Sequence, residues 1–441
     1  MANEVKKTRE GLVRSIGTKA LGVNIFNMVV GGGIFVLPGV IAANLGPAAI
    51  IAYVICAVAV GLIFMCYAEI GSRITRSGGS YAYIEDAFGP MAGFVSSMLL
   101  WFGWAILSDA AILVAMVETI SIVVPVLKEP IPRALFMVVL LSFLVFMNIR
   151  GVETGKRLYI VNTIAKFVPL GMLLIFGVFA INFDNLKISE WPTFEQVGAS
   201  TIILIFAFSG AECALNASGE IKNPSRTVPR GVLLGMGSIF LLYLGLQSVA
   251  QGVLGPELAN NTEAPLAAAA KEVFGEWGVN LLLIGGVISI FSTLSGDILV
   301  TPRVVFASAR DGNLPAFLAK VHPKFHTPYV AVVFFAGVMC LIAISGTFSV
   351  LAVLASGSIL LIYAGVSLSV IKLRLRDGDP KDDQFKVPGK FIIPVLSCAV
   401  IAWMLFQMEY EEALSILALV LFSLGLYIFR KYILKKQPSE N

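Results

Sequence analysis

The chain has 441 residues, of which 57% are hydrophobic and 14% are charged. Soluble globular chains carry about 25% charged residues, and the mean hydropathy here is +0.87. This composition excludes an ordinary soluble domain. It indicates an all-α integral membrane protein, because helices satisfy their own backbone hydrogen bonds in lipid. The net charge of +4 gives no indication of a nucleic-acid partner, and we expect the lipid bilayer to be a partner.

Twelve hydrophobic runs are long enough to cross a bilayer, which takes about 20 residues. In chain order they cover residues 17–43, 48–69, 91–126, 133–149, 158–183, 197–218, 230–253, 278–308, 328–346, 349–371, 391–408 and 413–434. The N-terminal segment lacks a short apolar stretch with a cleavage site, so we expect the first run to be a permanent span.

Basic residues gather on one side of the predicted spans. With the N-terminus in the cytoplasm, 27 of the 32 Lys and Arg residues fall on the cytoplasmic side and four on the other. This asymmetry sets the orientation under the positive-inside rule, and the even number of spans returns the C-terminus to the cytoplasm. We therefore expect cytoplasmic tails at 1–16 and 435–441, in a plasma (inner) membrane.

The first run contains three consecutive glycines, in "NMVVGGGIFVLPG". Each Gly weakens a helix by about 1 kcal/mol relative to Ala, so the stretch predicts an interruption. An interrupted helix in lipid is tolerated only where its freed backbone groups face protein or a watery cavity, and those groups can then bind a ligand. The candidate substrate-binding residues of this break are Val29, Gly31, Gly32, Gly33 and Ile34.

The sixth run has a similar break in "ASTIILIFAFSGAECALNASGE", where Ser209 and Gly210 interrupt the apolar sequence and Glu212 follows. Its candidate substrate-binding residues are Phe206, Ala207, Phe208, Ser209 and Gly210. We assign Glu212 a coupling or structural role. Interrupted helices at matching positions in two halves are typical of a transporter's central site. Close helix packing through small residues is the alternative explanation of such glycines.

A weak internal repeat supports two halves. "YIEDAFGPMAG" after the second run matches "AAKEVFGEWGV" after the seventh at an offset of 186 residues. The charge distribution places the first copy in the cytoplasm and the second outside, as an inverted repeat requires. The expected units are spans 1–5 (17–183), spans 6–10 (197–371) and two peripheral spans (391–434).

These motifs resemble the amino acid-polyamine-organocation (APC) family of secondary transporters. The resemblance extends over about residues 15 to 370, through "VVGGGIFVLPG", "YAEIGSRITRSGGSYAYIEDAFG", "FSGAECALNASGEIKNPSRTVPRG" and "PRVVFASARDGNLPAFLAKVHPKFHTP". It implies a LeuT-like five-plus-five inverted repeat with discontinuous helices 1 and 6. It further implies that the substrate carboxylate meets the backbone of Gly32 and Gly33, that its ammonium meets carbonyls of Val29, Phe206 and Ser209, and that Phe206 lies at a gate.

Lys166 lies in the middle of the fifth run, where a lysine costs about 2.5–3.5 kcal/mol on insertion scales. The resemblance implies that it occupies the place of a second sodium ion and ties span 1 to span 5, as a sodium substitute or as a proton carrier. A lysine in a water-filled inner vestibule is the structural alternative.

Two carboxylates lie deep in apolar runs: Asp109, next to Ser108 in the third run, and Asp297 in the eighth. Such groups usually face a cavity or a partner, and the repeat predicts similar depths for them. Together with Ser108 they are candidate substrate-binding residues that suit a cationic side chain. Alternatively, Asp109 pairs with Lys166 or relays a proton.

The sequence therefore predicts a sodium-independent secondary active amino acid transporter, driven by proton coupling or by substrate exchange. A cationic amino acid or diamine exchanger is the alternative, and a substrate-sensing receptor on the same scaffold is a remote one. We expect an amino acid, the bilayer and, under proton coupling, protons as partners. We expect no catalytic residue, cofactor or metal, since the two histidines, His322 and His326, lie in one loop. The substrate and the oligomeric state stay open.

Overall fold

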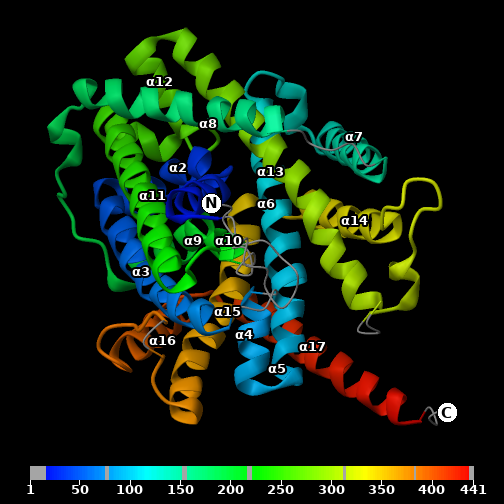
Figure 1. The fold of residues 1–441 in the computed structure, drawn as a ribbon. Coiled ribbons are helices and arrows are strands. Elements are labelled where there is room, and N and C mark those ends of the chain that lie inside the picture. Colours follow the sequence, from blue (N-terminus) through cyan, green and yellow to red (C-terminus); the bar gives the residue numbers. More distant parts are fainter. Residues whose placement is uncertain are drawn as a thin grey trace, which may run out of the picture.

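The structure is a computed structural model that describes residues 16–74, 79–150, 156–215, 221–310, 314–381 and 384–436. Within these ranges every regular element is a helix (Figure 1). The one strand-like feature there is an isolated bridge between Ile16 and Ile221. The all-α prediction is therefore confirmed.

The long helices coincide with the hydrophobic runs of the sequence. The first half contains α1 (Thr18–Val29), α2 (Gly33–Leu45), α3 (Ala49–Arg73), α4 (Gly79–Phe88), α5 (Pro90–Met98), the π-helical η2 (Leu99–Ile106), α6 (Leu107–Ser121), α7 (Pro130–Ile149) and α8 (Lys156–Gly177). The second half contains α9 (Phe194–Phe208), α10 (Ala211–Leu215), α11 (Pro224–Leu254), α12 (Pro265–Phe274), α13 (Glu276–Arg310), α14 (Tyr329–Ser345) and α15 (Phe348–Asp377), and is followed by α16 (Ile392–Phe406) and α17 (Tyr410–Lys436).

Eight helical segments of the described residues are long and apolar enough to cross a membrane, where the sequence predicts twelve spans. The difference falls on predicted spans 1, 6, 9 and 11. Breaks divide the first and sixth spans into shorter helices, and α14 and α16 are apolar but have only 17 and 15 residues. The twelve-span count is therefore not established by helix length.

The segments differ in how much of their surface the protein covers. The most buried is Pro90–Ser121, with 78% of its apolar window inside the protein, followed by Phe348–Asp377 with 67%. The most exposed is Tyr410–Phe429, with 11%. The chain therefore builds its core around α5, α6 and α15, and leaves α17 at the periphery (Figure 1).

Two short helices have the same local structure in the two halves. The helix α4 ends at Gly89 (φ 93°) and α12 ends at Gly275 (φ 72°), glycines that lie 186 residues apart. In each case the glycine N–H donates to the carbonyl four residues earlier, at 2.7 Å, and a long helical segment begins directly afterwards. In Figure 1, α4 and α12 lie at opposite ends of the molecule.

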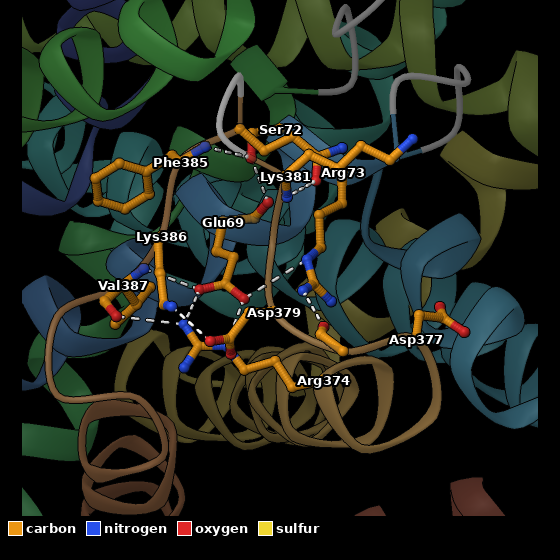
Figure 2. A network of polar contacts seen from close by, with 12 residues as sticks. Glu69, Ser72, Arg73, Arg374, Asp377, Asp379, Lys381, Phe385, Lys386 and Val387 are labelled. Atoms are coloured by element: carbon orange, nitrogen blue, oxygen red, sulfur yellow. Dashed lines mark hydrogen bonds and ion pairs between the residues drawn. The ribbon is translucent and has the colours of Figure 1, made fainter.

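A buried ion pair joins the ends of α3 and α15 to the segment before α16 (Figure 2). Arg374 donates from Nε to Glu69 Oε1 at 2.8 Å and pairs through Nη2 with Oε2. The N–H of Val387 also donates to Glu69, at 2.9 Å, and Phe385 N–H donates to Ser72 Oγ at 3.0 Å. Both charged side chains are fully buried. This network fixes three distant segments at one end of the helical bundle.

Candidate functional site

Both predicted helix interruptions are present in the structure. The helix α1 ends at Val29 and α2 begins at Gly33, while α9 ends at Phe208 and α10 begins at Ala211. At the second break Gly210 has a φ of 114°, a backbone conformation that favours glycine. The breaks shorten each span and free backbone carbonyl and N–H groups inside the bundle.

Tyr243 of α11 brings the two breaks together. Its hydroxyl lies 3.2 Å from the carbonyl oxygen of Val29 and 3.2 Å from that of Ala207, and its side chain is fully buried. One hydroxyl thus reaches the last carbonyl of α1 and a carbonyl in the last turn of α9. Sequence reasoning missed Tyr243, because a tyrosine in an apolar helix is equally suited to core packing.

The three glycines of the first break face different surroundings. A Cβ on Gly32 would lie 2.8 Å from Ile290 Cγ1, and one on Gly33 would lie 3.2 Å from the ring of Phe206. A Cβ on Gly31 would meet no atom closer than 3.9 Å. In this conformation Gly32 is therefore required by close packing against α13, and Gly31 has free space beside it.

Phe206 forms part of an aromatic layer above the first break. Its ring centroid lies 6.1 Å from that of Trp104 and 5.6 Å from that of Phe348, with the Phe348 ring edge-on. Phe206 itself is 6% exposed. The neighbouring candidate residues Ile34, Ala207 and Phe208 are also buried. Through Phe206 the layer lies directly against Gly33.

The carboxylate of Glu212 is held in place by hydrogen bonds at the second break. Its carboxylate accepts from the Gly210 N–H at 3.0 and 3.1 Å and from the Tyr363 hydroxyl at 2.7 Å, and it is 1% exposed. The Ser209 hydroxyl donates to the carbonyl of Ile205 at 2.7 Å, so the Ser209 side chain is bonded within its own helix. The carboxylate of Glu212 thus links α10 to α15 and receives a backbone donor of the break.

Lys166 of α8 reaches the first break from the side. Its Nζ donates to the carbonyl of Asn27 at 2.7 Å and to that of Val30 at 2.8 Å, and the residue is 4% exposed. These carbonyls lie at the C-terminal end of α1, where the helix dipole favours a cation. The ammonium therefore joins α8 to the end of α1, and its acceptors are backbone carbonyls, not Asp109.

Asp109 of α6 and Asp297 of α13 lie close enough to interact electrostatically. Asp109 is 2% exposed, its Oδ2 has no hydrogen-bond partner within the described structure, and Ser108 beside it is also buried. Cys213 of α10, a residue with exposed surface, lies close to both acids. Two helices from different halves thus place a polar pair beside an accessible part of α10.

The acids lie near the first break. Asp297 follows Thr293 by four residues on α13, and Thr293 Oγ1 is the side-chain atom nearest to the open side of Gly31. Four residues of helix rise by about 6 Å. Asp297 thus lies one helical turn along α13 from the residue that faces Gly31.

A family model described as amino acid permease matches residues 16–424. The chain belongs to the amino acid permease family. This finding confirms the resemblance to APC transporters, and the family and its relatives are transporters, not enzymes. The family and the apolar helices together identify the permease as an integral membrane protein.

Three curated relatives from Bacillus subtilis (strain 168) are similar to this permease over most of its length. A methylthioribose transporter is 26% identical over 431 residues, covering 92% of this chain and 91% of its own. The branched-chain amino acid permease BcaP is 26% identical over 448 residues (95% and 93%). The serine/threonine exchanger SteT is 27% identical over 400 residues (88% and 90%). Because these names differ in cargo at equal identity, they do not fix the substrate.

The permease also has a cavity of about 660 Å³ beside the aromatic layer, with Phe348 in its lining. Its apolar lining includes Val36 of α2, Ile203 of α9 and Phe348 of α15. The ring of Phe348 packs against Phe206, and Phe206 lies against Gly33 of the first break.

Proposed function

We propose that this permease is a secondary active amino acid transporter that binds its substrate between the two helix breaks and works by alternating access. The observation that carries the proposal is the single hydroxyl of Tyr243, which contacts carbonyls of both breaks. Two interruptions far apart in sequence therefore offer their free backbone groups to one place.

The two ends of an amino acid match this arrangement. The N–H groups at the start of α2, from Gly31 to Gly33, have no intrahelical acceptors and lie at a positive dipole end, so they suit the α-carboxylate. Carbonyls at the ends of α1 and α9 suit the α-ammonium, namely those of Val29, Phe206 and Ser209. The space beside Gly31 supports approach from that side.

A LeuT-like inverted repeat is part of the proposal, with spans 1–5 at 17–183, spans 6–10 at 197–371 and two peripheral spans. The paired breaks and the matching turns at Gly89 and Gly275 support it, as does the placement of α4 and α12 at opposite ends of the molecule. The excess of basic residues on one side places both termini in the cytoplasm under the positive-inside rule. The plasma membrane is the proposed location of the permease.

We infer that transport is independent of sodium, because the ammonium of Lys166 already occupies carbonyls at the end of α1. A cation that is part of the chain removes the need for a dissolved one. The driving force is then either a proton gradient or exchange for a second amino acid.

A cationic amino acid or a diamine is the second candidate substrate. The proximity of Asp109 and Asp297 supports it, since two neighbouring carboxyl groups, one of them a helical turn from Thr293 beside Gly31, can receive an ammonium or guanidinium side chain by charge-assisted hydrogen bonds. A substrate with a neutral side chain needs no carboxyl group in the protein to bind that side chain.

Counterflow of radiolabelled amino acids into proteoliposomes tests the proposal, with unlabelled amino acids and diamines as competitors. We expect saturable uptake that a receptor would not support. Gly31→Val should abolish it, because the side chain fills the substrate space, while the purified protein keeps its thermal stability. Normal uptake by Gly31→Val, or the absence of counterflow with every compound, would contradict the proposed function.

A further inference from the structure

The cavity of about 660 Å³ beside the aromatic layer is lined by four charged side chains. They are Glu118 of α6, Lys128 of η3 (Pro125–Lys128), Arg133 of α7 and Glu263 before α12. Lys128 Nζ lies 3.1 Å from Glu263 Oε1, and Arg133 Nη2 lies 3.5 Å from Glu118 Oε1. Charges of both signs therefore lie side by side in one open space, in a protein with few charged residues.

The Glu118–Arg133 pair is loosely engaged. Charge-assisted N–H···O bonds are typically about 2.7–2.9 Å long, and this pair is held at 3.5 Å. In addition, Arg133 Nε is buried and has no hydrogen-bond partner within the described structure, although a buried donor normally has one. The Arg133 and Glu118 side chains are also 27% and 28% exposed, so a ligand in the cavity can reach both members of this loose pair.

The cavity's size and lining suit a small zwitterion. Ligand pockets usually measure about 300–1,000 Å³ and combine an apolar lining with a few polar groups. Here the volume is about 660 Å³, and apolar side chains such as Val36, Ile203 and Phe348 lie beside the charged ones. An α-amino acid has one carboxylate, one ammonium and, in most cases, an apolar side chain.

We propose that this cavity is a second, low-affinity binding site for zwitterionic α-amino acids, with the carboxylate at Arg133 and the ammonium at Glu118. The apolar side chain of the ligand then lies against Val36 and Phe348. The proposal rests on the proposed function for its purpose, since the cavity is lined by Phe348, which contacts Phe206 beside Gly33 of the first break. Binding at the cavity is itself independent of transport.

A purely structural role for the two ion pairs is the competing explanation. In that case Arg133 and Glu118 would only fasten α6 to α7, and no ligand would bind. The two explanations differ in whether binding requires both ends of the amino acid, and in whether it survives when the central site is blocked.

Ligand-observed NMR on the purified permease tests the proposal, with L-leucine and L-serine as probes. Isopentylamine, which lacks the carboxylate, and 4-methylpentanoic acid, which lacks the ammonium, serve as competitors. Gly31→Val blocks the central site, and Lys271→Gln is the control, because the exposed Lys271–Glu276 pair lies outside the cavity.

We expect millimolar leucine binding that persists in Gly31→Val and Lys271→Gln, falls at high salt and falls at least tenfold in Gly31→Val/Arg133→Gln. The amine and the acid should each compete at least tenfold less well than leucine. Glu118→Gln provides a second variant and should weaken leucine binding while leaving the acid's weak binding unchanged. No binding by Gly31→Val, equal competition by the amine, or loss of thermal stability together with binding in both charge variants would overturn the proposal. Loss of counterflow alone would instead refute the proposed function.

Discussion

Replacing Lys166 by alanine is the most direct test of how the first break is held. The change leaves the carbonyls of Asn27 and Val30 without the donor that now lies 2.7 and 2.8 Å away. Each buried group left unsatisfied costs about 1–3 kcal/mol, so the two together destabilise the junction by at least about 2 kcal/mol, which is a factor of about 30. We expect uptake to fall by about that factor or more, with normal membrane insertion.

The assay is counterflow in proteoliposomes, run in sodium and in choline buffers with equal amounts of inserted protein. Wild-type uptake should be the same in both buffers, because the Lys166 ammonium takes the place of a dissolved cation. Lys166→Arg is the matched control and should retain part of the activity, since it keeps a charged donor. Two results would refute the reasoning: loss of wild-type uptake in choline, or near-normal uptake by Lys166→Ala.

Three further predictions concern other contacts of the structure. Tyr243→Phe should raise the KM for counterflow by up to about tenfold at normal stability, because one hydrogen bond contributes about 0.5–1.5 kcal/mol. An unchanged KM would show that Tyr243 has no role in substrate binding. Arg374→Met should lower the thermal unfolding temperature strongly, since breaking a buried ion pair costs about 3–5 kcal/mol and leaves Glu69 with the Val387 N–H and with Arg73 Nε at 3.7 Å. Glu69→Leu/Arg374→Met should recover most of the loss. If the substrate is cationic, Asp297→Asn should weaken competition by lysine or arginine at least tenfold and that by alanine little, whereas an unchanged competition profile would remove this substrate class.

The helix breaks could be predicted because their cause is local. Three consecutive glycines and a Ser-Gly pair weaken a helix wherever they occur, and the structure has its interruptions at these residues. The depth of Lys166 could likewise be read from its position in an apolar run. These features depend on the composition of a few neighbouring residues, and no knowledge of tertiary packing is needed.

Other features depend on how distant helices pack. Tyr243 contacts carbonyls of two other helices, and Arg374 pairs with a residue 305 positions away. In sequence the tyrosine resembles a core residue, and the arginine resembles one more cytoplasmic charge. The packing of Gly32 is a further example, since only the structure shows that a Cβ there would lie 2.8 Å from Ile290 of α13.

The pair Asp109 and Asp297 could be predicted only in part from the sequence. The repeat offset places the counterpart of Asp109 at position 295, two residues before Asp297, and therefore predicts similar depth on related helices. Depth alone does not decide the partner, and Lys166 was an equally reasonable one. In the structure Lys166 bonds to carbonyls, and Asp109 lies beside Asp297. Two carboxylates side by side in an apolar span repel each other unless a cation or a proton lies between them, so the cationic side chain of a substrate would relieve a repulsion that the chain itself does not neutralise with Lys166.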